Sequence, residues 1–317
     1  MEDVPSKLVG FSRRIIPVVA ALGGLLVLVF AVPFLWVLVV PSDTTFNVVA
    51  ETERVVMRVE HQVPWRWPLT QVGLRRGETV QTVSGSLELG FPVEVTFERV
   101  GFGMLSVDVT PAKAEGKTCE PATRFDESEE AKEQIGCDFS LLVDEIPARA
   151  ARGETVVFTL EGDIAAGRPV GFETRGSGTA LLRTGRVTLR ERSIITRTLY
   201  EAGAQDLEAG DYFAVNKRND DVPARGLVVV DERPAMTTAF RIIGREATIE
   251  RPGGGRYPIS TELLSRFAND RVFRFTSAII AAIIGLITLS AAVVEGLDRR
   301  ETTASKVDAP GSTTSSA

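Results

Sequence analysis

The chain is poor in the residues that most often build catalytic and metal sites. Its 317 residues include one histidine, two cysteines and three tyrosines. Because His61 is the only histidine, sites with two or three histidine ligands are excluded, and a Ser-His-Asp mechanism would have to use it. Neither a Gly-x-Ser-x-Gly nor a Ser-x-x-Lys motif occurs. We therefore expect a protein that is not an enzyme and uses neither a cofactor nor a metal.

The chain also lacks an excess of positive charge. It carries 36 Lys+Arg against 42 Asp+Glu, a formal net charge of −6. Nucleic-acid binding depends on neutralising phosphates with basic side chains. We therefore expect no nucleic acid among its partners.

Two long stretches lack charge altogether. Residues 15–40 and 275–294 contain no Asp, Glu, Lys or Arg. Both reach the roughly 20 residues that an α-helix needs to cross a bilayer. The sequence therefore predicts a membrane protein in which two transmembrane helices flank a central domain.

Basic residues near these stretches predict the orientation. Lys7, Arg13 and Arg14 precede the first stretch, and Arg299 and Arg300 follow the second. Four arginines just before the second stretch point the other way, but the first helix usually decides. We expect cytoplasmic termini and a periplasmic or extracytoplasmic domain at a plasma (bacterial inner) membrane. The predicted division is a tail at 1–14, a helix at 15–40, the extracytoplasmic domain at 41–274, a helix at 275–294 and a disordered tail at 295–317.

Alternating polar and apolar residues indicate that the central domain is all-β. From Val83 to Phe97 every second residue is apolar or glycine, and Gly90 and Pro92 break the pattern into two strands. Similar short patterns recur with Gly, Pro and Asp turns between them, as in a β-sandwich or barrel. The domain is either one unit or two subdomains, 43–147 and 148–258.

The two cysteines lie in an acidic insert, residues 112–140. A lone pair in an extracytoplasmic domain favours a disulfide between Cys119 and Cys137, whereas two buried thiols would fit a reducing compartment. The composition of Glu127–Gln134 favours a short helix. We expect a helical, disulfide-closed insert.

Two sets of side chains are candidates for a binding surface. Trp65 and Trp67 flank Arg66 between two prolines, which fits a stacking platform for a sugar or a partner, core packing, or contact with a membrane surface.

The second set is Arg186, Arg190 and Arg192, which the strand period places on one face. That face is suited to an anionic polymer or to the acidic insert, and a solvated face is the simplest alternative.

Small residues recur every four positions in both uncharged stretches. They are Ala20 and Gly24 in the first, and Ser277, Ala281 and Gly285 in the second. Such faces let helices approach closely, within one chain or between copies in a homo-oligomer.

Three segments resemble the type I signal peptidases. They are Gly210–Lys217, Pro223–Val230 and Arg241–Gly244, which are similar to three boxes of that family in the same order. Ala202 stands where the family has its nucleophilic serine, and Phe240 stands where it has its general-base lysine. The resemblance therefore implies an inactive relative.

These features favour a non-enzymatic scaffold, assembly or interaction protein of the cell envelope. Expected partners are the lipid bilayer, other membrane or envelope proteins, and copies of the same chain. A binding module for a sugar or anionic envelope polymer and an inactive signal-peptidase-like relative are the alternatives.

Overall fold

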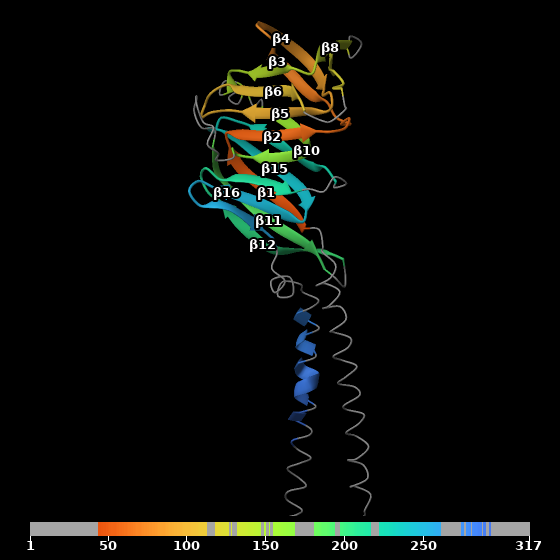
Figure 1. Cartoon of the computed structure of the whole chain (residues 1–317), viewed down its shortest axis with the longest axis vertical. Helices are drawn as coiled ribbons and strands as arrows, with labels where there is room; N and C mark the ends of the chain where they lie inside the picture. The colour runs from red at the N-terminus through yellow and green to blue at the C-terminus, as the bar shows by residue number, and fades with distance from the viewer. Residues whose placement is uncertain are drawn as a thin grey trace, which may run out of the picture.

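The computed structural model describes residues 44–112, 118–126, 128, 132–146, 149, 152, 155–168, 181–193, 197–216, 222–260 and short runs between 274 and 292. This part of the chain is mostly antiparallel β-sheet and contains seventeen strands. In Figure 1 the strands stack along the long axis, with β3, β4 and β8 at the upper end and β11 and β12 at the lower end.

The strands form two sheets that share β10. In spatial order, the first sheet contains β12 (Leu199–Leu207), β11 (Leu182–Arg192), β1 (Thr44–Thr52), β15 (Met236–Gly244), β14 (Ala224–Val230) and β10 (Val156–Ala166). The second contains β17 (Gly255–Ile259), β16 (Glu246–Arg251), β13 (Tyr212–Asn216), β10, β2 (Arg54–Val59), β5 (Val93–Glu98), β6 (Leu105–Pro111), β9 (Phe139–Val143), β3 (Trp67–Arg76), β4 (Thr79–Glu88), β7 (Ala122–Phe125) and β8 (Lys132–Gly136).

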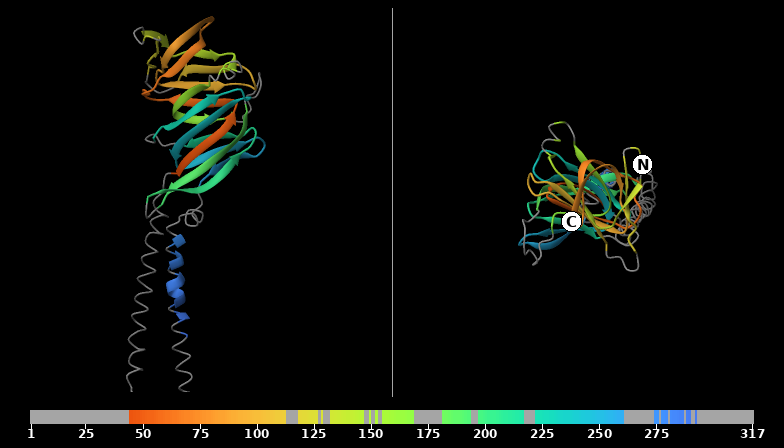
Figure 2. Two further views of the ribbon diagram at one scale, coloured as in Figure 1. Left: turned by 180° about the vertical axis from the view of Figure 1, so that it is seen from behind. Right: turned by 90° about the horizontal axis from the view of Figure 1, so that it is seen from above.

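The period of two along each strand explains which side chains fill the interior. Phe46, Val48 and Ala50 of β1 are buried, and Val55 and Met57 of β2 continue the pattern. Such alternation sends every second side chain to the same face of a sheet. Viewed along the long axis, the strands curl around this shared interior (Figure 2).

Strand β10 passes from one sheet to the other at Gly162. Residues before it pair with β14, and residues after it pair with β2. Gly162 has φ +149°, and a Cβ built there would lie 2.1 Å from the carbonyl oxygen of Arg58. Only glycine fits this close backbone approach.

Aromatic packing joins the two sides of the proposed subdomain boundary at 147/148. Trp67 is fully buried, with its ring centroid 5.6 Å from Phe97 and 5.1 Å from Phe158. Its indole N–H also donates to the carbonyl of Thr159 over 2.9 Å. The core is therefore one cluster that spans both sheets.

The predicted transmembrane architecture needs correction. No helix in the described part of the chain is long and apolar enough to cross a membrane. Residues 15–40 lie outside the described residues, and only part of 275–294 is described. The prediction of two transmembrane helices is therefore wrong on this finding, as are the plasma-membrane localisation and periplasmic placement derived from it.

The prediction of a helical acidic insert is also wrong for the residues that the structure describes there. Lys132–Gly136 is strand β8, which pairs with β7, and β7 pairs in turn with β4. Helix propensity is a weak preference, and pairing with a neighbouring strand overrides it here.

Candidate functional site

The turn between β5 and β6 presents three apolar side chains to solvent. Val100, Phe102 and Met104 are 48, 65 and 44% exposed. The N–H of Gly103 donates to the carbonyl of Val100 over 3.0 Å, which closes a tight turn. We call these three side chains the apolar turn.

Arg99 supports the apolar turn from the interior. This arginine is fully buried and donates through Nε to the carbonyl of Gly103 over 3.1 Å. Its Nη1 donates to the carbonyls of Asp231, Arg233 and Ala235 over 2.9, 3.0 and 2.7 Å. Burial lowers the pKa of the guanidinium, although nearby Asp231 opposes this effect. Because a guanidinium carries five donors in a fixed plane, one side chain holds the turn against the 231–235 loop.

Glu53 supports the same turn from the junction of β1 and β2. Its carboxylate accepts the N–H of Gly101 over 3.2 Å, the N–H of Leu181 over 3.1 Å and the Nη2 of Arg183 over 2.7 Å. Burial tends to raise the pKa of this carboxyl, but the bonds from Arg183, Leu181 and Gly101 together hold the pKa below its ordinary value. A backbone bond from Ala235 N–H to the carbonyl of Gly101 fixes the turn further.

Of the tryptophan pair predicted from the sequence, one side chain belongs to the core. Trp67 is fully buried, and Trp65 stacks on it at 5.6 Å and donates to Glu161 over 3.1 Å. Arg66 lies over the ring of Phe125, with 3.7 Å from its guanidinium carbon to the ring centroid. Trp67 is thus not available to a ligand.

The predicted arginine face lies elsewhere. Arg186, Arg190 and Arg192 are exposed on the outer side of β11, as the strand period predicted. Arg186 lies 3.8 Å from Asp206 of β12, and Arg190 is opposite Glu201. Strands β3 and β11 occupy opposite ends of the body in Figure 1, so the structure does not bring the tryptophans and these arginines together.

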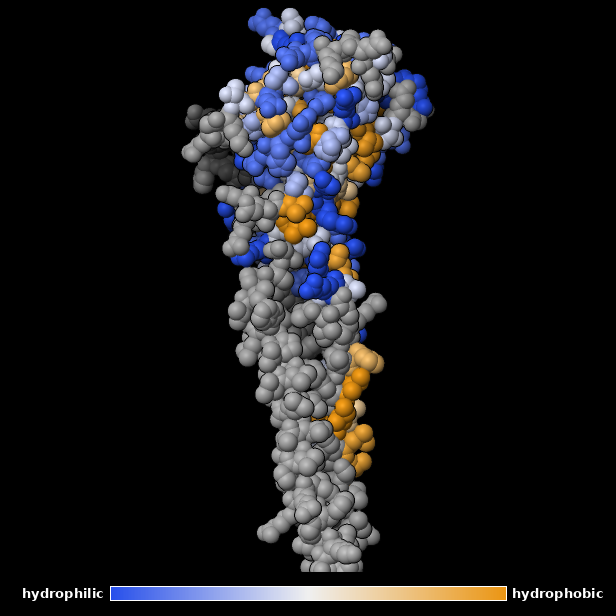
Figure 3. Space-filling view, turned by 90° about the vertical axis from the view of Figure 1, so that its right-hand side faces the viewer, coloured by the Kyte–Doolittle hydropathy of each residue, from blue (hydrophilic) through white to orange (hydrophobic). Residues whose placement is uncertain are grey.

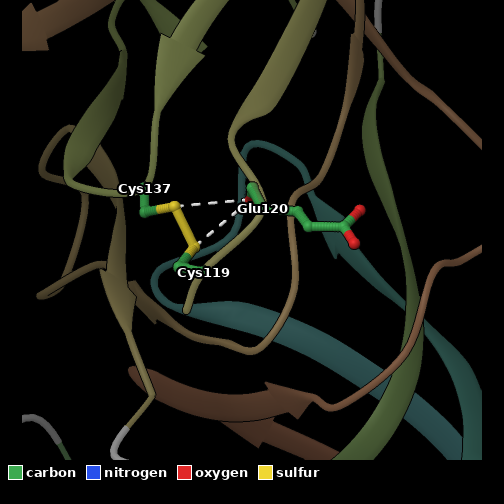
Figure 4. Close-up of a disulfide and its surroundings, with 3 residues drawn as sticks. All are labelled: Cys119, Glu120 and Cys137. Carbon is green, nitrogen blue, oxygen red and sulfur yellow. Dashed lines mark hydrogen bonds between the residues drawn. A yellow bond between two sulfur atoms is a disulfide. The ribbon is translucent and has the colours of Figure 1, made fainter. Parts of the chain in front are cut away.

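The disulfide predicted within the acidic insert is confirmed. Cys119 and Cys137 are bonded, and both sulfurs lie near the carbonyl oxygen of Glu120, at 3.2 and 3.3 Å (Figure 4). These contacts are not hydrogen bonds, because the sulfurs of a disulfide carry no proton to donate. Glu133 pairs with Arg76 and Arg124 instead of the arginine face of β11.

The predicted helix-contact residues are described only in part. Ala20 and Gly24 lie outside the described residues. Ser277, Ala281 and Gly285 are helical and exposed, and a Cβ at Gly285 would meet no described atom within 4 Å. No neighbouring helix covers them within the described residues.

The two positions highlighted by the signal-peptidase resemblance are buried. Ala202 on β12 and Phe240 on β15 are 3 and 4% exposed, and Phe240 packs near Phe213 at 6.2 Å between ring centroids. Within the described residues, no group of three or more His, Cys, Asp and Glu is placed to hold a metal ion. No protein-family model, curated protein or solved structure matches this chain.

The apolar turn was not identified from the sequence as a site. Gly101-Phe102-Gly103 predicts only a turn, and the carbonyls that hold its supporting Arg99 lie about 130 positions away in the chain. The one local signal was an aromatic residue between two glycines, because turns are mostly built from polar residues.

Proposed function

We propose that this protein is a non-enzymatic interaction module that binds a protein partner through the apolar turn. The observation that carries the proposal is the exposure of Val100, Phe102 and Met104 on a backbone fixed from behind by Arg99 and Glu53. The scaffold role expected from the sequence is retained in this form, without the membrane attachment.

The physical basis is a rigid apolar contact. Burying a phenylalanine side chain contributes about 1.5–3 kcal/mol, and a turn that is already ordered loses little conformational freedom on binding. Binding energy at interfaces is concentrated in a few buried anchors, often aromatic ones. An exposed apolar turn of this kind fits a partner protein with an apolar cleft. On the face of the upper body in Figure 3, apolar residues form separate patches among hydrophilic ones.

Site-specific photo-crosslinking tests the proposal. The photoreactive residue p-benzoylphenylalanine replaces Phe102 in cells that make the full-length chain, and a matched variant carries it at Val80, which is 57% exposed on β4. We expect one protein to be crosslinked at position 102 and not at position 80. Equal products at both positions, or none at 102, would contradict the proposal.

A second measurement separates a specific contact from chance proximity. The crosslinked protein is identified and purified, and its affinity for the unmodified chain is measured by calorimetry. Because Phe102 is the largest side chain of the apolar turn, Phe102→Ala should weaken binding on the order of tenfold or more. Val80→Ala should leave the affinity unchanged, and an equal loss in both variants would disprove the assignment.

A further inference from the structure

A groove of about 340 Å³ opens on the outer side of the second sheet, between β2, β10 and β13. It exists because β13 and β10 share a single pairing, Ala166 opposite Phe213, and then diverge. Strand β2 pairs with β10 over Asp163–Ala166 and forms the other wall. The volume is at the lower end of the range for small-molecule sites. The groove shares no residue with the apolar turn.

One end of the groove holds hydrogen-bond donors that are poorly paired. The Nη1 of Arg54 approaches the Glu98 carboxylate only to 3.8 Å, and its buried Nε has no partner among the described residues. Tyr212 lines the groove beside Arg54, and burial, followed by the Glu250 carboxylate, raises the pKa of its hydroxyl. Tyr212 therefore stays protonated at neutral pH and can donate. The Nε is buried, but the Arg54 side chain is 24% exposed and its loosely paired Nη groups can donate to a charged acceptor.

The other end of the groove carries an excess of negative charge. Arg58 bonds Glu94 over 3.1 Å and lies opposite Asp163 in the β2–β10 pairing. Glu94 neutralises Arg58, and Asp163 leaves one negative charge in excess at this end, which disfavours a ligand with several negative charges. A single negative charge near Arg54 is therefore the best match.

The middle of the groove is apolar. Val56 of β2, Ala165 of β10 and Ala214 of β13 line it between the charged ends. Short side chains leave space there for a hydrocarbon group. Pockets that are mostly apolar with a few placed polar groups are typical of small-ligand sites.

We propose that this groove binds a small organic carboxylate, with its carboxylate against Arg54 and Tyr212 and its short apolar body over Val56, Ala165 and Ala214. The arriving carboxylate accepts from the guanidinium and the phenol together. The limited volume selects short or single-ring carboxylates. This binding activity goes beyond the proposed interaction function and does not depend on it.

Calorimetry with defined probes tests the ligand class. Sodium hexanoate and sodium benzoate are titrated into the full-length protein, with hexanamide and hexylamine as probes of similar size that lack the negative charge. We expect saturable binding of the two carboxylates and at least tenfold weaker binding of the amide and the amine. No binding of either carboxylate at millimolar concentration, or equal binding of hexanamide, would overturn the proposal.

Variants locate the site. Arg54→Gln and Tyr212→Phe should each weaken carboxylate binding on the order of tenfold, whereas Arg190→Gln on β11 should not change it. Ala214→Trp fills the groove while leaving every polar group in place, so it should abolish binding even where Arg54→Gln prevents folding. Circular dichroism checks the fold of each variant. Wild-type affinity in folded Ala214→Trp protein would rule out the groove.

Discussion

At the scale of single residues, buried charges in this protein hold backbone segments together. Arg99 and Arg149 are buried, and both donate to main-chain carbonyls, those of Thr70 and Gln71 among the partners of Arg149. Asp211 is fully buried and receives two bonds of 2.9 Å from Arg251. Removing one member of such a group leaves its partners buried and unpaired. This lowers the free energy of unfolding by more than the bonds themselves contribute to it.

The contribution of Glu53 to the free energy of unfolding depends on pH. Its folded pKa is lowered, so the stability that it contributes is present above its ordinary pKa of 4.5 and is lost as the pH falls through the folded value. Glu53→Gln should therefore lower the free energy of unfolding at pH 7 by about 1–3 kcal/mol. The difference from wild type should shrink below about pH 4.5.

Urea unfolding at pH 7, 5 and 4 measures this effect. Glu232→Gln is the control, because that carboxylate is exposed and lies in the neighbouring 231–235 loop. If the loss of unfolding free energy in Glu53→Gln stays constant over this pH range, the negative charge of Glu53 is not the source of that stability.

At the scale of elements, sequence patterns predict strands well where one face is buried. The alternation from Val83 to Phe97 corresponds to β4 and β5, with the break near Gly90 and Pro92 as expected. The same reasoning fails at β8, where Lys132, Glu133 and Gln134 have good helix propensity but pair with β7 instead. The apolar turn lies beyond such patterns, because its exposure depends on contacts with the distant 231–235 loop.

Strand β10 belongs to both sheets and crosses from one to the other at Gly162, and this crossing gives a prediction at the scale of elements. Gly162→Ala places a Cβ against the carbonyl of Arg58 and demands a φ that side chains rarely adopt. We expect a loss of roughly 2 kcal/mol or more in the free energy of unfolding. Gly203→Ala on β12 meets no atom within 4 Å and should be nearly neutral. Denaturant unfolding of both variants measures the difference, and equal losses would show that the transfer does not depend on this glycine.

At the scale of the whole molecule, the described strands depend on one core. The pairings of β10 with β2 and with β14 connect segments on both sides of position 147. Trp67 lies before this boundary, and its partner Phe158 lies after it. A chain whose largest core side chains cross a boundary does not divide there into independent units, since each part would expose the face that the other covers.

We therefore expect residues 44–260 to unfold in one cooperative transition. With Trp36 replaced by phenylalanine, tryptophan fluorescence reports on Trp65 and Trp67, and amide exchange of β14 reports on the later part, so both probes should give the same midpoint in denaturant. Phe158→Ala should lower both midpoints together, at a cost of about 3–5 kcal/mol, because it leaves a cavity beside Trp67. Val157→Ala is the matched control, since Val157 is its exposed neighbour on β10 and should cost under about 1 kcal/mol. Separate midpoints for the two probes, or a Phe158→Ala effect confined to one of them, would show two units that fold independently.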